Sequence, residues 1–145
     1  MKETYIEDFE AWKKDFTFSV DIEVRFSETD MFGHLNNTVP FVYFEQARIG
    51  LMNELDIMGN AMSKEAENIP VVADLQCDFL GQIFFGDTVK MYVKYAKIGG
   101  SSADIHYMGT VNGEVKLTGR GALVQINSKT GKPVKWSDSQ LQLVQ

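Results

Sequence analysis

The chain has 145 residues, a formal net charge of −6, and 44% hydrophobic and 12% aromatic residues. This length suits one domain, and the hydrophobic content is too high for a disordered chain. The negative charge argues against non-specific nucleic-acid binding, which needs clustered Lys and Arg to replace counterions.

The sequence predicts a cytoplasmic protein that neither crosses nor binds a membrane. Its first residues lack the basic and apolar regions of a signal peptide. The longest stretch without Asp, Glu, Lys or Arg runs from Met31 to Phe44, which is too short to span a bilayer. The single cysteine, Cys77, excludes an internal disulfide and suits a reducing compartment.

Residues 1–16 are predicted to form an N-terminal amphipathic extension ahead of a single domain at 17–145. Ile6, Phe9, Trp12 and Phe16 recur at helical spacing with charged residues between them. This pattern predicts a short extra helix whose role is packing, onto the sheet or a partner subunit.

Residues 17–26 alternate between apolar and polar side chains, which predicts a strand with Phe26 as the last residue of its buried face. Residues 38–58 are apolar around most of a helix circumference, which predicts a helix surrounded by protein. Pro40 falls in its first turn, with Asn37 or Thr38 as the cap. Residues 59–68 are predicted to be a loop.

The second half of the chain predicts four antiparallel strands. Apolar residues alternate within 73–79, 89–95, 103–109 and 115–126. Asn112-Gly113 is a strong hairpin signal, and a change of phase around Gly119 to Gly121 predicts a β-bulge or sharp bend. The expected fold is α+β, with a five-stranded antiparallel sheet wrapped around one long central helix.

A polar loop joins the first strand to this helix, and its residues carry the strongest functional signal. The loop contains Asp30, Gly33 and His34, followed by Asn36 and Asn37. A carboxylate beside a helix N-terminus can act on a carbonyl, because backbone N–H groups and the helix dipole favour developing negative charge there.

The segment Arg25–Arg48 resembles the signature of the hotdog-fold thioesterases, in particular the 4-hydroxybenzoyl-CoA/acyl-CoA thioesterase group. The matching positions are Arg25, Phe26, Asp30, Gly33, His34, Leu35, Asn36, Asn37, Phe44, Glu45, Ala47 and Arg48. The stretches Phe79–Val89 and Lys97–Pro133 also resemble the family, so the similarity covers about residues 17–135.

The resemblance implies a hotdog fold, hydrolysis of an acyl- or aroyl-CoA thioester without metal or other cofactor, and a homodimer or homotetramer. It implies that Asp30 attacks the thioester or activates water, that His34 assists, and that Gly33, Asn36 and Asn37 bind substrate. Local features offer other roles: an Asx turn for Asp30, a structural imidazole for His34, and capping for the asparagines. Gly33 could instead supply a positive φ.

Several departures from the family pattern blur the substrate. Some relatives carry His in place of Asn37 and Tyr in place of Phe26. An acidic chain that binds coenzyme A would also need a local basic patch, for which Arg120, Lys129 and Lys132 are candidates. The alternatives to a CoA thioesterase are a non-catalytic acyl-thioester-binding protein and an acyl-carrier-protein thioesterase.

The remaining candidate residues favour structural roles. Glu45 and Arg48 are spaced to pair on one helix face, and Cys77 alternates with apolar residues as a core side chain would. His106 falls on the polar face of a strand, which predicts an exposed side chain. The two histidines and one cysteine lack metal-ligand spacing.

Overall fold

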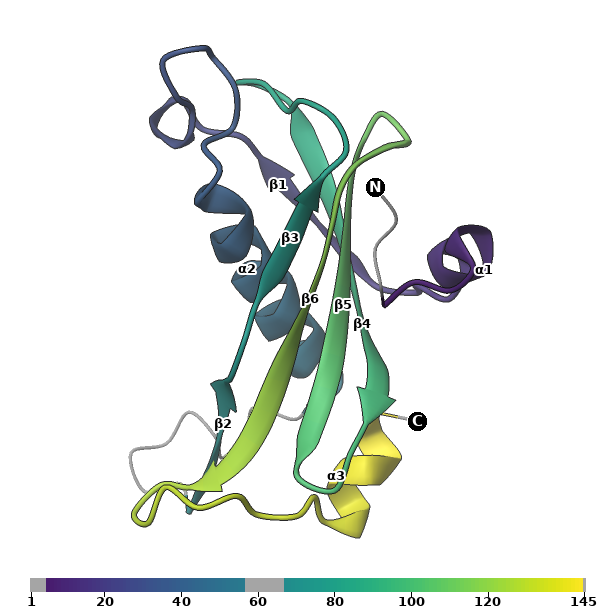
Figure 1. The fold of residues 1–145 in the computed structure, drawn as a ribbon, viewed down its shortest axis with the longest axis vertical. Helices are drawn as coiled ribbons and strands as arrows, with labels where there is room; N and C mark the ends of the chain where they lie inside the picture. Colours follow the sequence, from purple (N-terminus) through teal and green to yellow (C-terminus); the bar gives the residue numbers. More distant parts are fainter. Residues whose placement is uncertain (1–4, 57–66, 145) are drawn as a thin grey trace.

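A computed structural model describes residues 5–56 and 67–144, in which a curled antiparallel sheet surrounds helix α2 (Figure 1). The elements follow the chain in this order: α1 (Phe9–Lys14), β1 (Ser19–Glu23), the 3₁₀ helix η1 (Phe26–Glu28), α2 (Val39–Glu54), β2 (Asn68–Val72), β3 (Gln76–Phe79), β4 (Thr88–Ile98), β5 (Ser102–Val111), β6 (Glu114–Asn127) and α3 (Asp138–Leu143). The predicted α+β architecture with a short N-terminal helix is confirmed.

The sheet has six strands, where five were predicted, in the order β1-β4-β5-β6-β2 with β3 also paired to β6. The strands β2 and β3 lie one after the other along the same edge of β6. The strand predicted from residue 73 begins at Gln76, because Asp74 turns its carboxylate to the backbone N–H of Ala122. Asn68 belongs to β2, whereas the rest of the predicted 59–68 loop lies outside the described residues except for Glu67.

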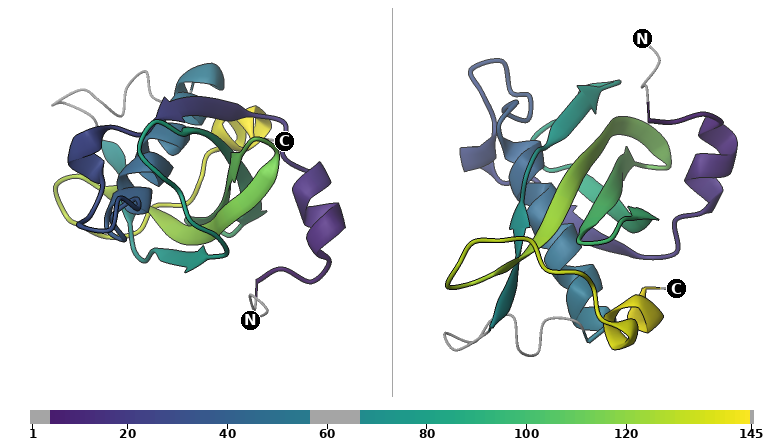
Figure 2. Two further views of the ribbon diagram at one scale, coloured as in Figure 1. Left: turned by 90° about the horizontal axis from the view of Figure 1, so that it is seen from above. Right: turned by 60° about the horizontal axis from the view of Figure 1, so that its bottom comes forward.

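Helix α2 packs its buried residues against the concave face of the sheet, which curls around it when seen from above (Figure 2). The ring of Phe44 stacks on Tyr107 with a centroid distance of 4.3 Å. Gly119 makes this close approach possible, because a Cβ there would overlap the Phe44 ring. Val42, however, is 56% exposed, so α2 is not surrounded on every side as predicted.

The predicted bulge lies elsewhere in β6. The register of β5 and β6 shifts where Gly109 pairs with Leu117 and Thr110 pairs with Val115, which leaves Lys116 as the extra residue. Gly119 and Gly121 pair regularly. The Asn112-Gly113 hairpin is confirmed, since both residues have positive φ (51° and 81°).

Helix α1 packs on the outer face of the sheet, opposite α2 (Figure 2). Ile6, Trp12 and Phe16 form a second buried cluster there with Met108 of β5. This helix covers His106, which is only 6% exposed, so the prediction of an exposed histidine is wrong. None of the helices in the described ranges is both long and apolar enough to cross a membrane.

Candidate functional site

The site predicted from sequence lies in the loop between η1 and α2, at one end of the molecule (Figure 1). The loop is held against the connection between β3 and β4. The Leu35 N–H donates to the carbonyl oxygen of Ile83 at 2.7 Å, and His34 forms an isolated β-bridge with Phe84. The strand predicted to include Phe26 ends at Glu23, and Phe26 is 77% exposed in η1.

Asp30 closes the loop through its backbone and one carboxylate oxygen. Its N–H donates to the His34 carbonyl at 2.8 Å, and Oδ1 accepts from the N–H groups of Phe32 (2.9 Å) and His34 (3.1 Å). Among residues 5–56 and 67–144, no group hydrogen-bonds Oδ2. The carboxylate is therefore fixed by one oxygen while the other is open to a ligand.

Gly33 and His34 complete the turn that holds Asp30. Gly33 has φ +78°, as the turn requires, and its N–H donates to the Asp30 carbonyl at 3.0 Å. The half-buried His34 ring meets the edge of Phe84 at 5.1 Å and lies 6.4 Å from Phe32. The described part of the chain provides no hydrogen bond to this imidazole, so both of its nitrogens are available.

The two asparagines differ. Thr38 is the N-cap of α2 but its own side chain makes no capping bond; instead Asn36 Oδ1 accepts from the N–H and the hydroxyl of Thr38, each at 3.0 Å. The Val39 N–H donates to the Asn36 carbonyl at 3.0 Å. Asn37 is exposed and its side chain makes no hydrogen bond to the described residues. Asn36 therefore shapes the start of the helix, whereas Asn37 is free for other contacts.

Glu28, which the sequence did not single out, joins this loop to α2. It is 9% exposed, and its Oε1 accepts from the Tyr43 hydroxyl at 2.8 Å and the Arg25 N–H at 2.9 Å. Burial raises the pKa of Glu28, but these hydrogen bonds and the nearby Arg25 guanidinium outweigh burial and leave the pKa below its usual range. The spacing of Arg25 and Glu28 as a capping box was the available signal, whereas Tyr43 is contacted only through the fold.

Large apolar side chains are exposed around Asp30, on both the loop and the β3–β4 connection. We call this the loop aromatic surface, and it comprises Phe26 (77% exposed), Met31 (89%), Phe32 (73%), Phe84 (44%) and Phe85 (60%). Phe26 and Phe85 meet edge to face at 5.7 Å. A concentrated apolar surface of this kind marks a place where a ligand or another protein binds.

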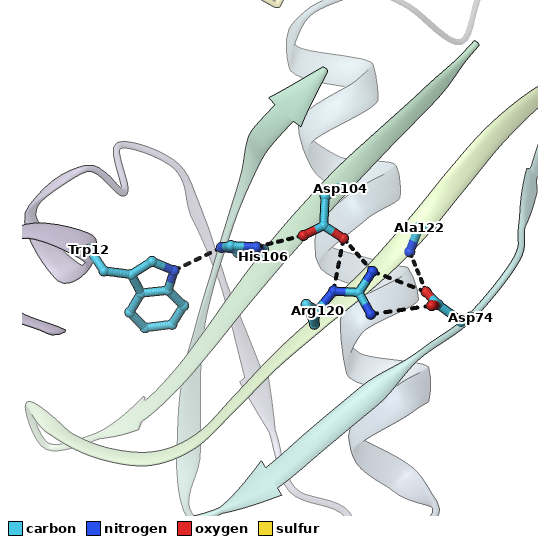
Figure 3. Close-up of polar contacts among 6 residues, drawn as sticks. All are labelled: Trp12, Asp74, Asp104, His106, Arg120 and Ala122. Atoms are coloured by element: carbon cyan, nitrogen blue, oxygen red, sulfur yellow. Dashed lines mark hydrogen bonds and ion pairs between the residues drawn. The ribbon is translucent and has the colours of Figure 1, made fainter. Parts of the chain in front are cut away.

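The predicted basic patch does not form. Arg120 is bound to Asp104 and Asp74 on the outer face of the sheet (Figure 3). Lys129 and Lys132 are exposed in the turn after β6, at the opposite end of the molecule from the loop (Figure 1). The exposed cation at the loop itself is Arg25, whose guanidinium lies 3.4 Å from Glu28.

Two predictions about other residues have different outcomes. In the described residues no ion pair joins Glu45 to Arg48, because Arg48 points into the core and donates to the Tyr107 hydroxyl at 3.1 Å while Glu45 is exposed. Cys77 packs against the core as predicted, and burial raises its pKa to about 12. The described residues contain no group of three or more His, Cys, Asp or Glu able to hold a metal ion.

The fold and this loop match a known family over most of the chain. The model of the thioesterase-like superfamily matches residues 24–144, so the chain belongs to that superfamily, and its architecture is the hotdog fold.

Three relatives illustrate the match. YsmA of Bacillus subtilis (strain 168), named an uncharacterized protein, is 43% identical over 133 residues, which cover 91% of this chain and 88% of YsmA. The structure of a predicted thioesterase from Bacillus stearothermophilus has a TM-score of 0.79 and 31% identity, with 88% of this chain and 92% of that chain covered. A thioesterase from Thermus thermophilus, complexed with coenzyme A and Zn, has a TM-score of 0.74 and 32% identity, covering 89% and 92%.

Proposed function

We propose that this protein is a cytoplasmic acyl-CoA thioesterase that hydrolyses an acyl- or aroyl-CoA thioester to the free acid and CoA. The observation that carries the proposal is the Asp30 carboxylate, with Oδ1 fixed by loop N–H groups and Oδ2 open beside the His34 imidazole. Membership of the thioesterase-like superfamily and the similarity to a coenzyme A-bound thioesterase support it.

In the proposed reaction Asp30 Oδ2 either attacks the thioester carbonyl carbon or removes a proton from the water that attacks it. Fixing Oδ1 leaves little freedom to be lost when Oδ2 approaches the carbonyl. His34 would orient water or transfer a proton, since its ring nitrogens are not used by the described residues. The positive end of the α2 dipole, which follows the loop directly, would favour the negative charge of the transition state.

We also propose the parts that would bind the substrate. Gly33 lets the backbone turn beside Asp30 and leaves open space where a side chain would lie. Asn37 is exposed at the start of α2 and could contact the thioester, whereas Asn36 would act by holding the loop. The acidic chain provides Arg25 as the nearby cation for the phosphates of coenzyme A.

We further propose that the protein works as a homo-oligomer, a dimer or a tetramer. The loop aromatic surface surrounds Asp30 and is exposed in a single chain, so a second chain that covers it would also enclose the site. Enclosure would remove water and strengthen the electrostatic effects on the thioester.

A panel of acyl- and aroyl-CoA thioesters tests the proposed function. The purified protein is incubated with each ester, thiol release is measured, and binding of each ester is measured separately by calorimetry. Turnover of at least one CoA ester supports the proposal. Binding without turnover would indicate the non-catalytic alternative, and turnover of carrier-protein thioesters alone would indicate the carrier-protein alternative.

A further inference from the structure

The outer face of the sheet carries a chain of polar contacts that runs from the N-terminal helix to the edge of the sheet (Figure 3). The indole Nε1 of Trp12 donates to His106 Nδ1 at 2.8 Å, and His106 Nε2 bonds Asp104 Oδ2 at 2.8 Å. The guanidinium of Arg120 then binds Asp104 and Asp74. None of these residues belongs to the loop that holds Asp30, so the chain of contacts needs another explanation.

The contacts define the protonation state of His106. An indole N–H can only donate, so Nδ1 must be the acceptor and carries no proton. The proton of the neutral ring therefore lies on Nε2 and is donated to Asp104. A doubly protonated imidazole would direct the Nδ1–H at the Trp12 N–H, which is a contact between two donors. Docking of Trp12 is thus compatible with the neutral ring only.

The neighbouring strands oppose a charge on His106 as well. His106 pairs across the sheet with Lys94 of β4 on one side and with Arg120 of β6 on the other. Like charges placed directly opposite on neighbouring strands destabilise a sheet. A charged His106 would stand between two cations, with Asp104 alone compensating while it also binds Arg120.

The N-terminal segment depends on this same point of attachment. The ring of Tyr5 meets the His106 ring at 4.8 Å, and the Lys94 ammonium donates to the Trp12 carbonyl at 2.8 Å and lies 3.8 Å from Asp15. A groove of about 740 Å³ between this segment, β4 and the C-terminal helix reaches His106 and gives solvent access to it. The other acidic groups that line the groove are Glu7 and Asp8.

We propose that His106 is a pH-sensitive latch that holds the segment 5–16 on the outer face of the sheet when neutral and releases it when protonated. Release would break the Trp12 bond and open the groove to water. The core between α2 and the concave face does not include His106 and would stay intact.

The direction of the pH effect follows from burial. Burial lowers the pKa of His106, the contact with Asp104 raises it, and Lys94 and Arg120 lower it further, so that the pKa lies below its ordinary value. The docked state therefore binds fewer protons than the released state. Docking is complete above the pKa of the released imidazole and is lost as the pH falls, by up to about tenfold in the docking equilibrium per pH unit.

Nuclear magnetic resonance of the two indole N–H groups tests the latch. We expect the Trp12 signal to change in one transition at mildly acidic pH, as its bond to Nδ1 is lost. The Trp136 indole donates to the Ser102 carbonyl at 3.0 Å, which does not titrate, so its signal serves as an internal control. A transition shared by both signals would overturn the proposal, because it would report general acid unfolding.

Two further measurements separate His106 from the carboxylates. His106→Asn keeps an acceptor for Trp12 but cannot titrate, and we expect it to abolish the Trp12 transition; persistence of the transition would overturn the latch. In the wild type, ¹⁵N shifts of the imidazole must show the Nε2–H form above the transition and the doubly protonated form below it. A ring that stays neutral throughout would contradict the proposal even if the variant failed to fold.

Discussion

The two carboxylate oxygens of Asp30 lie in different surroundings. Oδ1 takes part in a local turn with the N–H groups of Phe32 and His34, and Oδ2 is left open. The structural and the catalytic interpretations of this residue are therefore compatible, since one oxygen can serve each. The sequence could predict that Asp30 and Gly33 share a turn, because the bonds involved span only a few residues.

Glu28 provides a prediction about how the loop is held. We expect Glu28→Gln to lower the free energy of unfolding by about 1–3 kcal/mol, because the amide NH₂ cannot accept from Tyr43 and Arg25. The folded-state pKa of Glu28 is depressed, so its contribution is present above the ordinary carboxyl range and is lost as the pH falls through the lower value. Urea denaturation at pH 7 and in acid should therefore show a smaller difference between wild type and variant in acid.

A matched control is Glu23→Gln at an exposed position of β1. It should change stability by less than about 0.5 kcal/mol at either pH. Equal losses in both variants would show that the Glu28 contacts are not specifically stabilising.

Elements that are defined by local alternation were predicted well, and those that depend on distant partners were not. The Asn112-Gly113 hairpin needs only its own backbone geometry. The burial of His106 instead depends on Trp12, which lies 94 residues away in sequence. Arg120 likewise appeared free for coenzyme A until its two carboxylate partners were located.

The start of α2 gives a prediction that separates the two asparagines. We expect Asn36→Ala to cost about 1 kcal/mol in the free energy of unfolding, because Thr38 loses its acceptor. Asn37→Ala should leave stability unchanged and, under the proposed function, raise KM for the CoA ester. Thermal unfolding and steady-state kinetics on both variants check this. A loss of stability in Asn37→Ala with unchanged KM would contradict the assignment.

The contact between α2 and β6 gives a second prediction at this scale. A Cβ on Gly119 would overlap the Phe44 ring and lie 2.8 Å from the Gln76 carbonyl oxygen. We expect Gly119→Ala to cost about 1–3 kcal/mol by urea denaturation, as overpacking does. Gly100→Ala, where nothing lies within 4 Å, is the control and should be nearly neutral. Similar stability of the two variants would show that α2 can shift to make room.

The whole molecule uses the two faces of its sheet differently. The concave face packs α2 with apolar contacts, and the outer face holds the N-terminal helix through both apolar packing and the His106 contacts. The loop aromatic surface at one end of the molecule has no such cover in a single chain. An exposed apolar surface next to a reactive carboxylate favours an assembly in which another chain completes the site.

Assembly can be tested with a charge in this surface. We expect the wild type to sediment as a dimer or tetramer and Phe85→Glu to shift it toward monomer, because a buried charge without a partner is costly. Leu143→Glu on α3, also partly exposed, should leave the assembly unchanged. Analytical ultracentrifugation at several concentrations decides the matter. A monomeric wild type would contradict the oligomer proposal.

Hydrolysis at the loop is tested most directly by replacing the Asp30 carboxylate without changing its shape. The measurement is kcat/KM for thiol release from the best CoA ester, compared among wild type, Asp30→Asn and the control Asp21→Asn on the exposed face of β1. We predict a loss of at least about a hundredfold for Asp30→Asn and wild-type activity for Asp21→Asn. Undiminished turnover by a folded Asp30→Asn variant would contradict the account.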